Sequence, residues 1–483
     1  AETPLSWAFF TPDRAYKLLR PVEMPFLDHR EAADRLRSVA REFELNRVIC
    51  PDVYLGTADV IEDGEVADRM LVMRRLPAER RLSTLVDDPR FGYFLRAVAR
   101  RVAALHASRQ PVRDAPMARL PELAANWREN FDVIRPHVGR VIDAEEFDAV
   151  ERRVTAYLDR RDDLLDARID DGFVRDVHGD LTAEDIFCLD DGPRIVDCLA
   201  FNDRWRIIDV LNDIGFLVMD VHRLAGWQIA EQLMRWYQEF SNEHHPASLA
   251  HHYVTYRAHV RAKVACLRIG QGDAAQVDLA RRYHSLARDH AERARIRLVL
   301  VGGGPGTGKT SLSAGIGAQL GCPVLSSDEV RKSVTGTPAD THRFAPPVEV
   351  IYDDSTGAAF YRELLREAEA VLRSGSGVVL DATWTRDVYR RAARAVAHRC
   401  GAELVELECR VAPEVARQRV ARRRIDADGG SDATPEVVDH LAARREPWPE
   451  AHTLDTAAPA DQTIATSVAR IVELPLPGSE VTT

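Results

Sequence analysis

A glycine-rich segment in the last third of this 483-residue chain has the residue types and spacing to bind phosphate. It runs glycine, four residues, then Gly-Lys-Thr, and with the next residue its members are Gly303, Gly304, Pro305, Gly306, Thr307, Gly308, Lys309, Thr310 and Ser311. Glycines let the backbone turn its N–H groups around phosphate oxygens at the start of a helix. Lys309 should reach the outer phosphates and Thr310 should hold Mg²⁺. The segment predicts binding of ATP with magnesium.

The flanking sequence matches this interpretation. Ile296 to Val301 is typical of a buried strand, and Ser311 to Leu320 is typical of a helix that Gly321 ends. A strand, a glycine loop and a helix in this order favour a phosphate loop over a chance turn.

Two acidic residues are expected beside this loop. Asp328 follows the apolar run that starts at Pro323, and Asp381 ends the apolar run Val378 to Leu380. Carboxyl ends of parallel strands meet at one edge of a sheet, so both carboxylates should face the phosphates. Asp381 is then a magnesium ligand or a ligand of its water shell. The alternative for each is a helix-capping carboxylate.

Asp328-x-x-Arg331 resembles a motif of polynucleotide kinases and related small-metabolite kinases. The resemblance implies that Asp328 accepts the proton of an acceptor hydroxyl and that Arg331 grips the acceptor. An ion pair three residues apart on a helix is the structural alternative.

The predicted helix Glu414 to Arg424 is rich in arginine. In small phosphate-loop kinases, arginines in this region close over the transferred group, and a guanidinium binds phosphate bidentately. Arg417 and Arg422 are the candidates, with a solvated helix face as the alternative. Nucleic-acid binding is less favoured because no aromatic residues are interleaved.

A second group of acidic residues lies in Arg175-Asp176-Val177-His178-Gly179-Asp180-Leu181, which is followed by Ile195-Val196-Asp197. Here the chain resembles aminoglycoside phosphotransferases, the small-molecule branch of the protein-kinase fold. The resemblance implies that Asp180 is the base at the acceptor hydroxyl and that Asp197 binds Mg²⁺. Lys17 resembles the ATP-binding lysine of the small lobe, with Glu42 as the expected helix partner and Glu44 as the competitor.

This second centre departs from the family pattern in two ways. Asp185 stands where the family has an asparagine that binds the second Mg²⁺, so the metal site carries an extra negative charge. No glycine precedes Gly56, although a glycine-rich loop should come before Lys17. Either residues are missing from the start or this lobe closes weakly on ATP.

The centre around Asp180 and the phosphate-binding segment around Lys309 belong to two different expected folds. We expect an α/β multidomain chain: a kinase-like small lobe at residues 1–85, a helical large lobe at 86–291, and a phosphate-loop kinase domain with a parallel sheet at 292–483. Over its whole length the chain resembles bifunctional phosphotransferase/ATP-binding proteins, with runs such as Tyr54-Leu55-Gly56 and Phe201-Asn202-Asp203.

Composition narrows the class further. The formal net charge of −11 argues against a non-specific nucleic-acid coat. No uncharged apolar run is long enough to cross a membrane, and the start has no signal-peptide pattern. The seven cysteines include no Cys-x-x-Cys pair, as in reduced cytoplasmic proteins.

Together these features predict an ATP-dependent kinase that phosphorylates a small hydroxyl-bearing acceptor, with its main centre in the phosphate-loop domain. One alternative places the chemistry at the N-terminal site, acting on an antibiotic or sugar, with the other domain regulatory. A second alternative is a nucleotide-binding regulatory protein without an acceptor. The sequence leaves open the acceptor, including a nucleic-acid 5′-OH end, and the oligomeric state.

Overall fold

The computed structural model describes residues 5–24, 27–330, 354–425 and 442–473. The chain forms two compact units. Unit 1 comprises Ala1–Leu158, Leu165–His245 and Leu249–Ala294, and unit 2 comprises Asp159–Leu164, Pro246–Ser248 and Arg295–Thr483. Each unit has its own sheet structure and its own candidate centre, so the two are described in turn.

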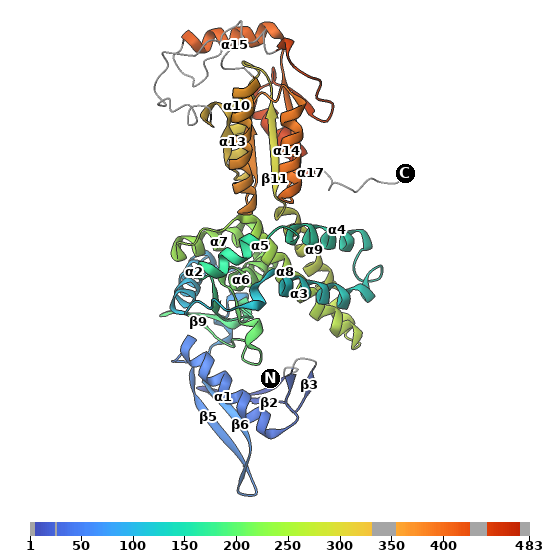
Figure 1. The fold of residues 1–483 in the computed structure, drawn as a ribbon. Helices are drawn as coiled ribbons and strands as arrows, with labels where there is room; N and C mark the ends of the chain where they lie inside the picture. The colour runs from blue at the N-terminus through green and yellow to red at the C-terminus, as the bar shows by residue number, and fades with distance from the viewer. Residues whose placement is uncertain (1–4, 25–26, 331–353, 426–441, 474–483) are drawn as a thin grey trace. The chain divides into compact units, whose positions relative to one another are not determined.

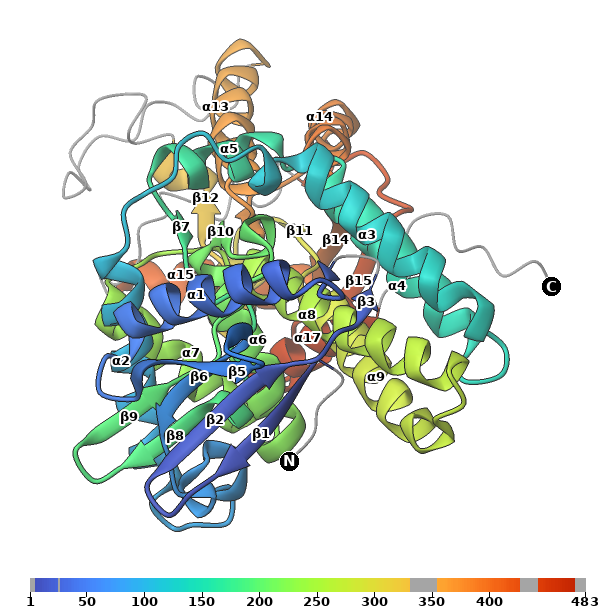
Figure 2. The same cartoon turned by 90° about the horizontal axis from the view of Figure 1, so that it is seen from below.

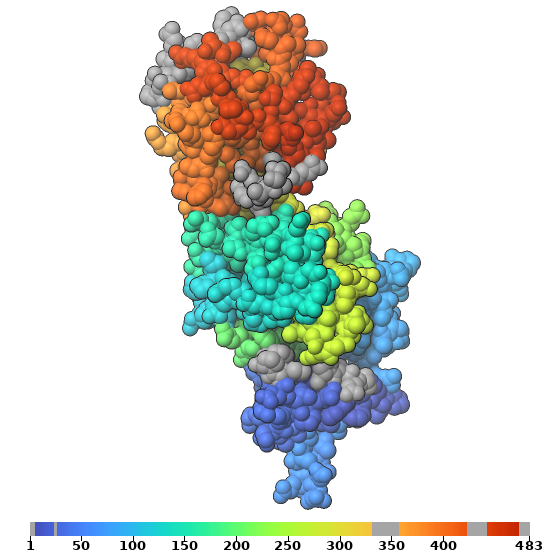
Figure 3. Space-filling view, turned by 90° about the vertical axis from the view of Figure 1, so that its right-hand side faces the viewer, coloured from blue at the N-terminus to red at the C-terminus, as the bar shows by residue number. Residues whose placement is uncertain are grey.

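Unit 1 begins with an antiparallel sheet in the order β1-β2-β6-β5. The small lobe consists of β1 (Ser6–Phe10), β2 (Arg14–Leu19), β3 (Glu23–Met24), β4 (Leu27–Asp28), α1 (Ala32–Ile49), β5 (Tyr54–Glu62) and β6 (Glu65–Arg74). Figure 2 shows α1 lying along the sheet, where Val39 of the helix and Leu71 of β6 share one core. The end of the β5–β6 hairpin projects from the lobe (Figure 3). Lys17 lies in β2, which pairs with β1.

The rest of unit 1 is mainly helical. Its helices are α2 (Phe91–Ser108), α3 (Leu120–Ile134), α4 (Ala144–Leu158), α5 (Asp162–Asp170), α6 (Val210–Ala225), α7 (Trp227–Ser241), α8 (Ala247–Gly270) and α9 (Val277–Arg293). Two small antiparallel pairs carry the motif residues, and they consist of β7 (Val174–Asp176) with β10 (Ile207–Asp209), and β8 (Ile186–Leu189) with β9 (Gly192–Ile195). Helix α6 is buried over most of its length, so it forms a rigid support for the motif loops.

Unit 2 contains a five-stranded parallel sheet in the order β12-β13-β11-β14-β15. Its elements are β11 (Arg297–Gly302), α10 (Lys309–Leu320), β12 (Val324–Ser326), α13 (Asp354–Arg373), β13 (Val378–Asp381), α14 (Asp387–Arg399), β14 (Glu403–Arg410), α15 (Pro413–Ile425), β15 (His452–Asp455) and α17 (Ala460–Glu473). Helix α10 packs on α17, and α13 packs on α14, which layers the sheet between helices (Figure 1).

The central strand of this sheet leads directly into the glycine-rich segment. Residues Leu298 to Val301 of β11 are fully buried, as the apolar run predicts. Helix α10 ends at Gly321, whose left-handed backbone (φ 65°) suits a residue without Cβ. Within the described ranges, every helix is too short or too polar to cross a bilayer.

Candidate functional site

The glycine-rich segment forms a tight loop between β11 and α10. Gly306 and Gly308 both have positive φ, at 79° and 88°. A Cβ on Gly306 would collide with the carbonyl oxygen of Ala416, so only glycine fits there. The Thr307 hydroxyl donates to the Gly304 carbonyl oxygen at 2.8 Å, which braces the turn from inside. The loop is therefore a preformed cradle at a helix N-terminus, where anions bind well.

Lys309 and Asp381 meet at the mouth of this cradle. Lys309 Nζ lies 3.4 Å from Asp381 Oδ1. The Asp381 side chain is only 1% exposed, and its Oδ1 atom has no hydrogen-bond donor. Such a buried carboxylate oxygen is costly unless a cation satisfies it, so the site fits Mg²⁺ beside Lys309. Thr310 and Ser311 are exposed in the first turn of α10.

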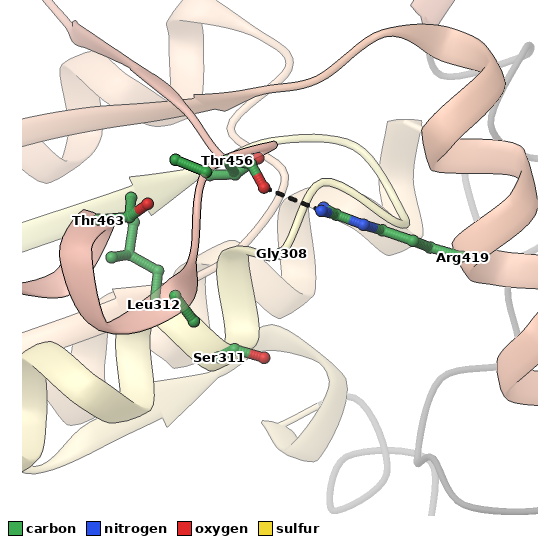
Figure 4. A pocket seen from close by; sticks show the side chains of 8 residues that line it. Gly308, Ser311, Leu312, Arg419, Thr456 and Thr463 are labelled. Carbon is green, nitrogen blue, oxygen red and sulfur yellow. Dashed lines mark hydrogen bonds between the residues drawn. The ribbon is translucent and has the colours of Figure 1, made fainter.

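A pocket of about 220 Å³ opens beside the loop (Figure 4). It is lined by Gly308, Ser311, Leu312, Arg419, Thr456, Ala458, Ala460 and Thr463. The Arg419 guanidinium donates to the carbonyl oxygens of Thr456 at 2.9 Å and of Gly306 at 3.5 Å. The Thr456 hydroxyl in turn donates to the Thr307 carbonyl oxygen at 2.5 Å. Helix α15 and the segment after β15 are thereby tied to the phosphate loop.

The sequence analysis chose two other arginines of α15, Arg417 and Arg422, as candidates to bind the transferred group. Arg417 pairs with Glu414 at 3.8 Å, and Arg422 is exposed. Neither Arg417 nor Arg422 lines the pocket, whereas Arg419 does. Helical phase separates Arg417 from Arg419, since residues two apart lie on different faces, whereas Arg422 is one turn further along the helix from Arg419. Arg331 lies outside the described residues.

Asp328 lies just beyond β12, whose last residue is in register with Asp381. Its backbone N–H donates to Ser326 Oγ at 3.2 Å. Burial raises the pKa of Tyr361 to about 12, and the Asp328 carboxylate adds to that rise. The Tyr361 hydroxyl accepts from the Trp384 N–H at 3.0 Å and shares a 3.2 Å hydrogen bond with Thr383. Asp328 therefore belongs to the same edge of the sheet as Asp381, as parallel strands require.

In unit 1, Lys17 joins the two lobes. Its ammonium lies 2.8 Å from Glu42 Oε1 on α1 and 2.6 Å from Asp197 Oδ1. Burial would lower the pKa of Lys17, but the Asp197 and Glu42 carboxylates outweigh burial and raise it. The lysine is thus a fixed cation, and its helix partner is Glu42 rather than Glu44. A lysine held by a helix glutamate is what kinase-type phosphoryl transfer requires.

The Asp197 backbone is held in an unusual conformation. Its φ of 62° is left-handed, which an aspartate adopts more readily than most residues. The Asp197 N–H donates to the Tyr54 hydroxyl at 2.8 Å, and the next N–H, of Cys198, donates to Asn46 Oδ1 at 2.9 Å. Small-lobe side chains therefore fix the turn that presents this carboxylate.

Asp180 and Asp185 complete this centre. Burial raises the pKa of Asp180, and the Arg261 guanidinium opposes that rise. Burial and then the charge of Asp197 raise the pKa of Asp185 well above its usual range, although Thr182 Oγ1 donates to it at 2.6 Å. Holding Asp185 as a carboxylate calls for a cation, which fits Mg²⁺.

Among the described residues, no group of three or more histidine, cysteine, aspartate or glutamate side chains is placed to hold a metal ion.

One supporting residue escaped the sequence analysis. Asp213 of α6 is fully buried and accepts the backbone N–H groups of His178 and Gly179 at 3.2 and 2.7 Å. His106 lies 3.1 Å from the same carboxylate. Asp213 therefore clamps the loop that carries Asp180. Its signal was an acidic residue inside the apolar run of α6, which a buried backbone partner explains.

The chain is similar to known proteins in part and over its whole length. Residues 298–448 match the family model described as an AAA domain. Uncharacterized proteins of Mycobacterium tuberculosis and Mycobacterium bovis are 35% identical over 467 residues, covering 96% of this chain and 93% of theirs.

Two solved structures are each similar to part of the chain. A gluconokinase from Sinorhizobium meliloti is 17% identical, covering 37% of this chain and 94% of that one, with a TM-score of 0.28. An APH(2″)-type aminoglycoside phosphotransferase in complex with GDP and kanamycin is 12% identical, covering 60% and 91%, with a TM-score of 0.40. The matched AAA domain, together with the parallel sheet and the glycine-rich loop of unit 2, agrees with the P-loop domain expected in the C-terminal part of the chain.

Proposed function

The chain belongs to the family of these uncharacterized mycobacterial proteins, and on that premise we propose that it is an ATP-dependent phosphotransferase whose main centre is the P-loop of unit 2. The observation that carries the proposal is the contact of Lys309 with the buried Asp381 at the mouth of a preformed glycine cradle. An acceptor-free nucleotide sensor would not need a further carboxylate such as Asp328 at the same edge of the sheet.

In this proposal the residues of unit 2 divide the work of phosphoryl transfer. The loop N–H groups and Lys309 bind and orient the phosphates of ATP. Asp328 accepts the proton of the acceptor hydroxyl while the new O–P bond forms and the bond between the β and γ phosphates breaks, so ADP leaves. Arg331, Arg417 and Arg422 are proposed to meet the negative charge of the transferred group. Mg²⁺, when bound by Thr310 and Asp381, would neutralise phosphate charge.

A second candidate function is phosphoryl transfer to a small molecule at the N-terminal centre. The assembled Lys17–Glu42–Asp197 group favours it, because this ion pair is the arrangement that kinase-type transfer uses. Asp180 would be the base, and Asp185 and Asp197 would hold Mg²⁺.

The test is to incubate the full chain with γ-labelled ATP and a small-molecule extract and to identify labelled products by mass spectrometry. Lys309→Ala should lower product formation by about 100-fold or more, because one charged donor to the transferring group is worth that much. Lys263→Ala removes a lysine that is already paired with Glu129 at 3.1 Å, and serves as the matched control. Full product formation by Lys309→Ala would refute the unit 2 centre.

A further inference from the structure

Three arginines pack against two aromatic rings next to helix α6, whose Asp213 and Asp220 side chains hold the backbone on either side of Asp180. We call this group the arginine cluster, and its members are Arg223 of α6, Arg257 and Arg261 of α8, Phe216 of α6 and Tyr283 of α9. Arg257 and Arg261 are one helical turn apart, and both guanidinium groups lie over the Phe216 ring, at 4.8 and 5.9 Å from its centroid. None of the roles assigned above uses this cluster.

Two of the three arginines already have strong partners. Arg257 is buried and donates through Nε to Asn212 Oδ1 at 2.7 Å. Arg223 lies 2.7 Å from Asp220, and Asp220 also accepts the backbone N–H of Ala183 next to the catalytic loop at 3.0 Å. The Arg223 guanidinium lies 6.0 Å from the centroid of the Tyr283 ring. The cluster is therefore fastened to the loop that carries Asp180.

Arg261 differs from both. It is partly buried, and among the described residues no carboxylate oxygen lies within 4.0 Å of its nitrogens. Burial would lower the pKa of Arg261, but the Tyr283 hydroxyl and the Asp180 and Asp220 carboxylates outweigh burial and raise it. Phe216, under the Arg261 guanidinium, lies on α6 between Asp213 and Asp220, which hold the backbone on either side of Asp180, so Arg261 lies next to that loop. A planar guanidinium with unused donors beside a candidate base is suited to hold an oxyanion bidentately.

We propose that Arg261 makes the N-terminal centre an oxyanion-binding site, so that its hydroxyl acceptor carries a phosphate or carboxylate group. The acceptor class rests on the second candidate function, phosphoryl transfer at the N-terminal centre. Anion binding by Arg261 does not depend on that transfer. A polycationic acceptor such as an aminoglycoside would face the Arg261 charge, which no carboxylate among the described residues pairs with, and like-charge repulsion disfavours such an acceptor. The acceptor class therefore differs from the one that the resemblance suggests.

The binding test uses inorganic phosphate as the probe, followed by phosphorus NMR. The full chain carries Lys309→Ala and is saturated with ADP and Mg²⁺, so that anion binding at the P-loop is suppressed. Arg261→Gln should weaken phosphate binding by about tenfold or more, and Arg261→Lys should lose less, because it keeps the charge but not the fork. Arg268→Gln on the same helix, where the arginine pairs with Asp273 at 2.8 Å, should bind like the parent.

A second arm adds acetate, which displaces phosphate if the site also takes carboxylates and leaves it bound if the site is selective for phosphate. Equal phosphate binding by Arg261→Gln and the parent overturns the proposal, and Arg261→Lys shows that the fold tolerates a change at this position.

A phosphoryl-transfer assay distinguishes failure of the proposed acceptor class from failure of the second candidate function. Fractions of a small-molecule extract retained by an anion-exchange or a cation-exchange resin are incubated with the Lys309→Ala chain and γ-labelled ATP. Labelled product from the anion-retained fraction that Arg261→Gln reduces about tenfold supports the acceptor class. Product from the cation-retained fraction alone overturns it. If no labelled product forms but phosphate binding still depends on Arg261, the result supports the anion site and refutes phosphoryl transfer at the N-terminal centre.

Discussion

The two candidate centres hold their lysines in different ways. Lys17 lies between two carboxylates, at 2.8 and 2.6 Å, so its charge is matched within the protein. Among the described residues Lys309 has one carboxylate partner, at 3.4 Å, and the Oδ1 atom of that buried carboxylate accepts no hydrogen bond. A lysine with one distant partner retains donors for a phosphate group, whereas Lys17 would have to share its charge. The comparison favours unit 2 as the stronger phosphate-binding centre.

The proposed magnesium ligands Asp381 and Asp185 should differ in their effect on the product formed by unit 2. Asp381→Asn should lower product formation by about 100-fold or more, because it removes the buried charge that faces Lys309 and the metal. The loss should be partly recovered at raised Mg²⁺ concentration in initial-rate measurements. Asp185→Asn restores the family residue and should leave the product of unit 2 unchanged. An Asp381→Asn enzyme with normal rates and normal Mg²⁺ dependence would break the comparison.

Substitutions of the α15 arginines should fall into two groups, one that weakens ATP binding and one that lowers the turnover rate. Arg419→Ala removes two donors that shape the pocket beside the P-loop, so ATP binding should weaken by about tenfold to 100-fold. Arg417→Ala and Arg422→Ala should lower the turnover rate with little change in ATP affinity if they meet the transferred group. Calorimetric titration with ATP and steady-state rates distinguish these outcomes. An unchanged dissociation constant for Arg419→Ala would show that the pocket does not hold nucleotide.

Stability against acid should also differ between the units. In unit 1, burial lowers the pKa of His284 from 6.5 to about 4 and that of His251 to about 3. Between these values and 6.5 the unfolded chain binds a proton that the folded chain does not. The free energy of unfolding of unit 1 should therefore fall as the pH drops below 6.5, by about 1.4 kcal/mol per pH unit for each histidine.

The check on this prediction is urea denaturation between pH 7 and pH 4.5. His284→Phe keeps the ring that stacks on Phe147 and should flatten the slope by about 1.4 kcal/mol per pH unit. His398→Phe changes an exposed histidine of α14 in unit 2 and serves as the control. A wild-type slope in His284→Phe would contradict the assignment.

The sequence was most informative where chemistry is local. The order of strand, loop and helix around Lys309 is contained in about 25 neighbouring residues, so local pattern was enough to predict it. Lys17 and Asp197 are 180 residues apart, and only resemblance to a family with a known topology brought them together. Periodicity alone could not have paired them.

The missed residues depend on tertiary contacts. Which arginine of α15 meets the P-loop is set by how the helix is rotated on Gly306 and Thr456, and a run of arginines does not fix that rotation. From the sequence, Asp213 is only an acidic residue in a helix, because its partners, the backbone N–H groups of His178 and Gly179, lie far away in the chain. Segment β15, which positions Thr456, is only four residues long and has no distinctive pattern.

The most direct test of the central claim compares the two candidate bases in one assay. Asp328→Asn and Asp180→Asn are nearly isosteric changes that remove a proton acceptor from unit 2 and unit 1, respectively. In reactions with γ-labelled ATP and the acceptor extract, we predict that Asp328→Asn lowers formation of the main product by about 100-fold to 10,000-fold, the usual worth of a general base. Asp180→Asn should leave that product unchanged. The reverse pattern would move the main centre to unit 1 and contradict the account.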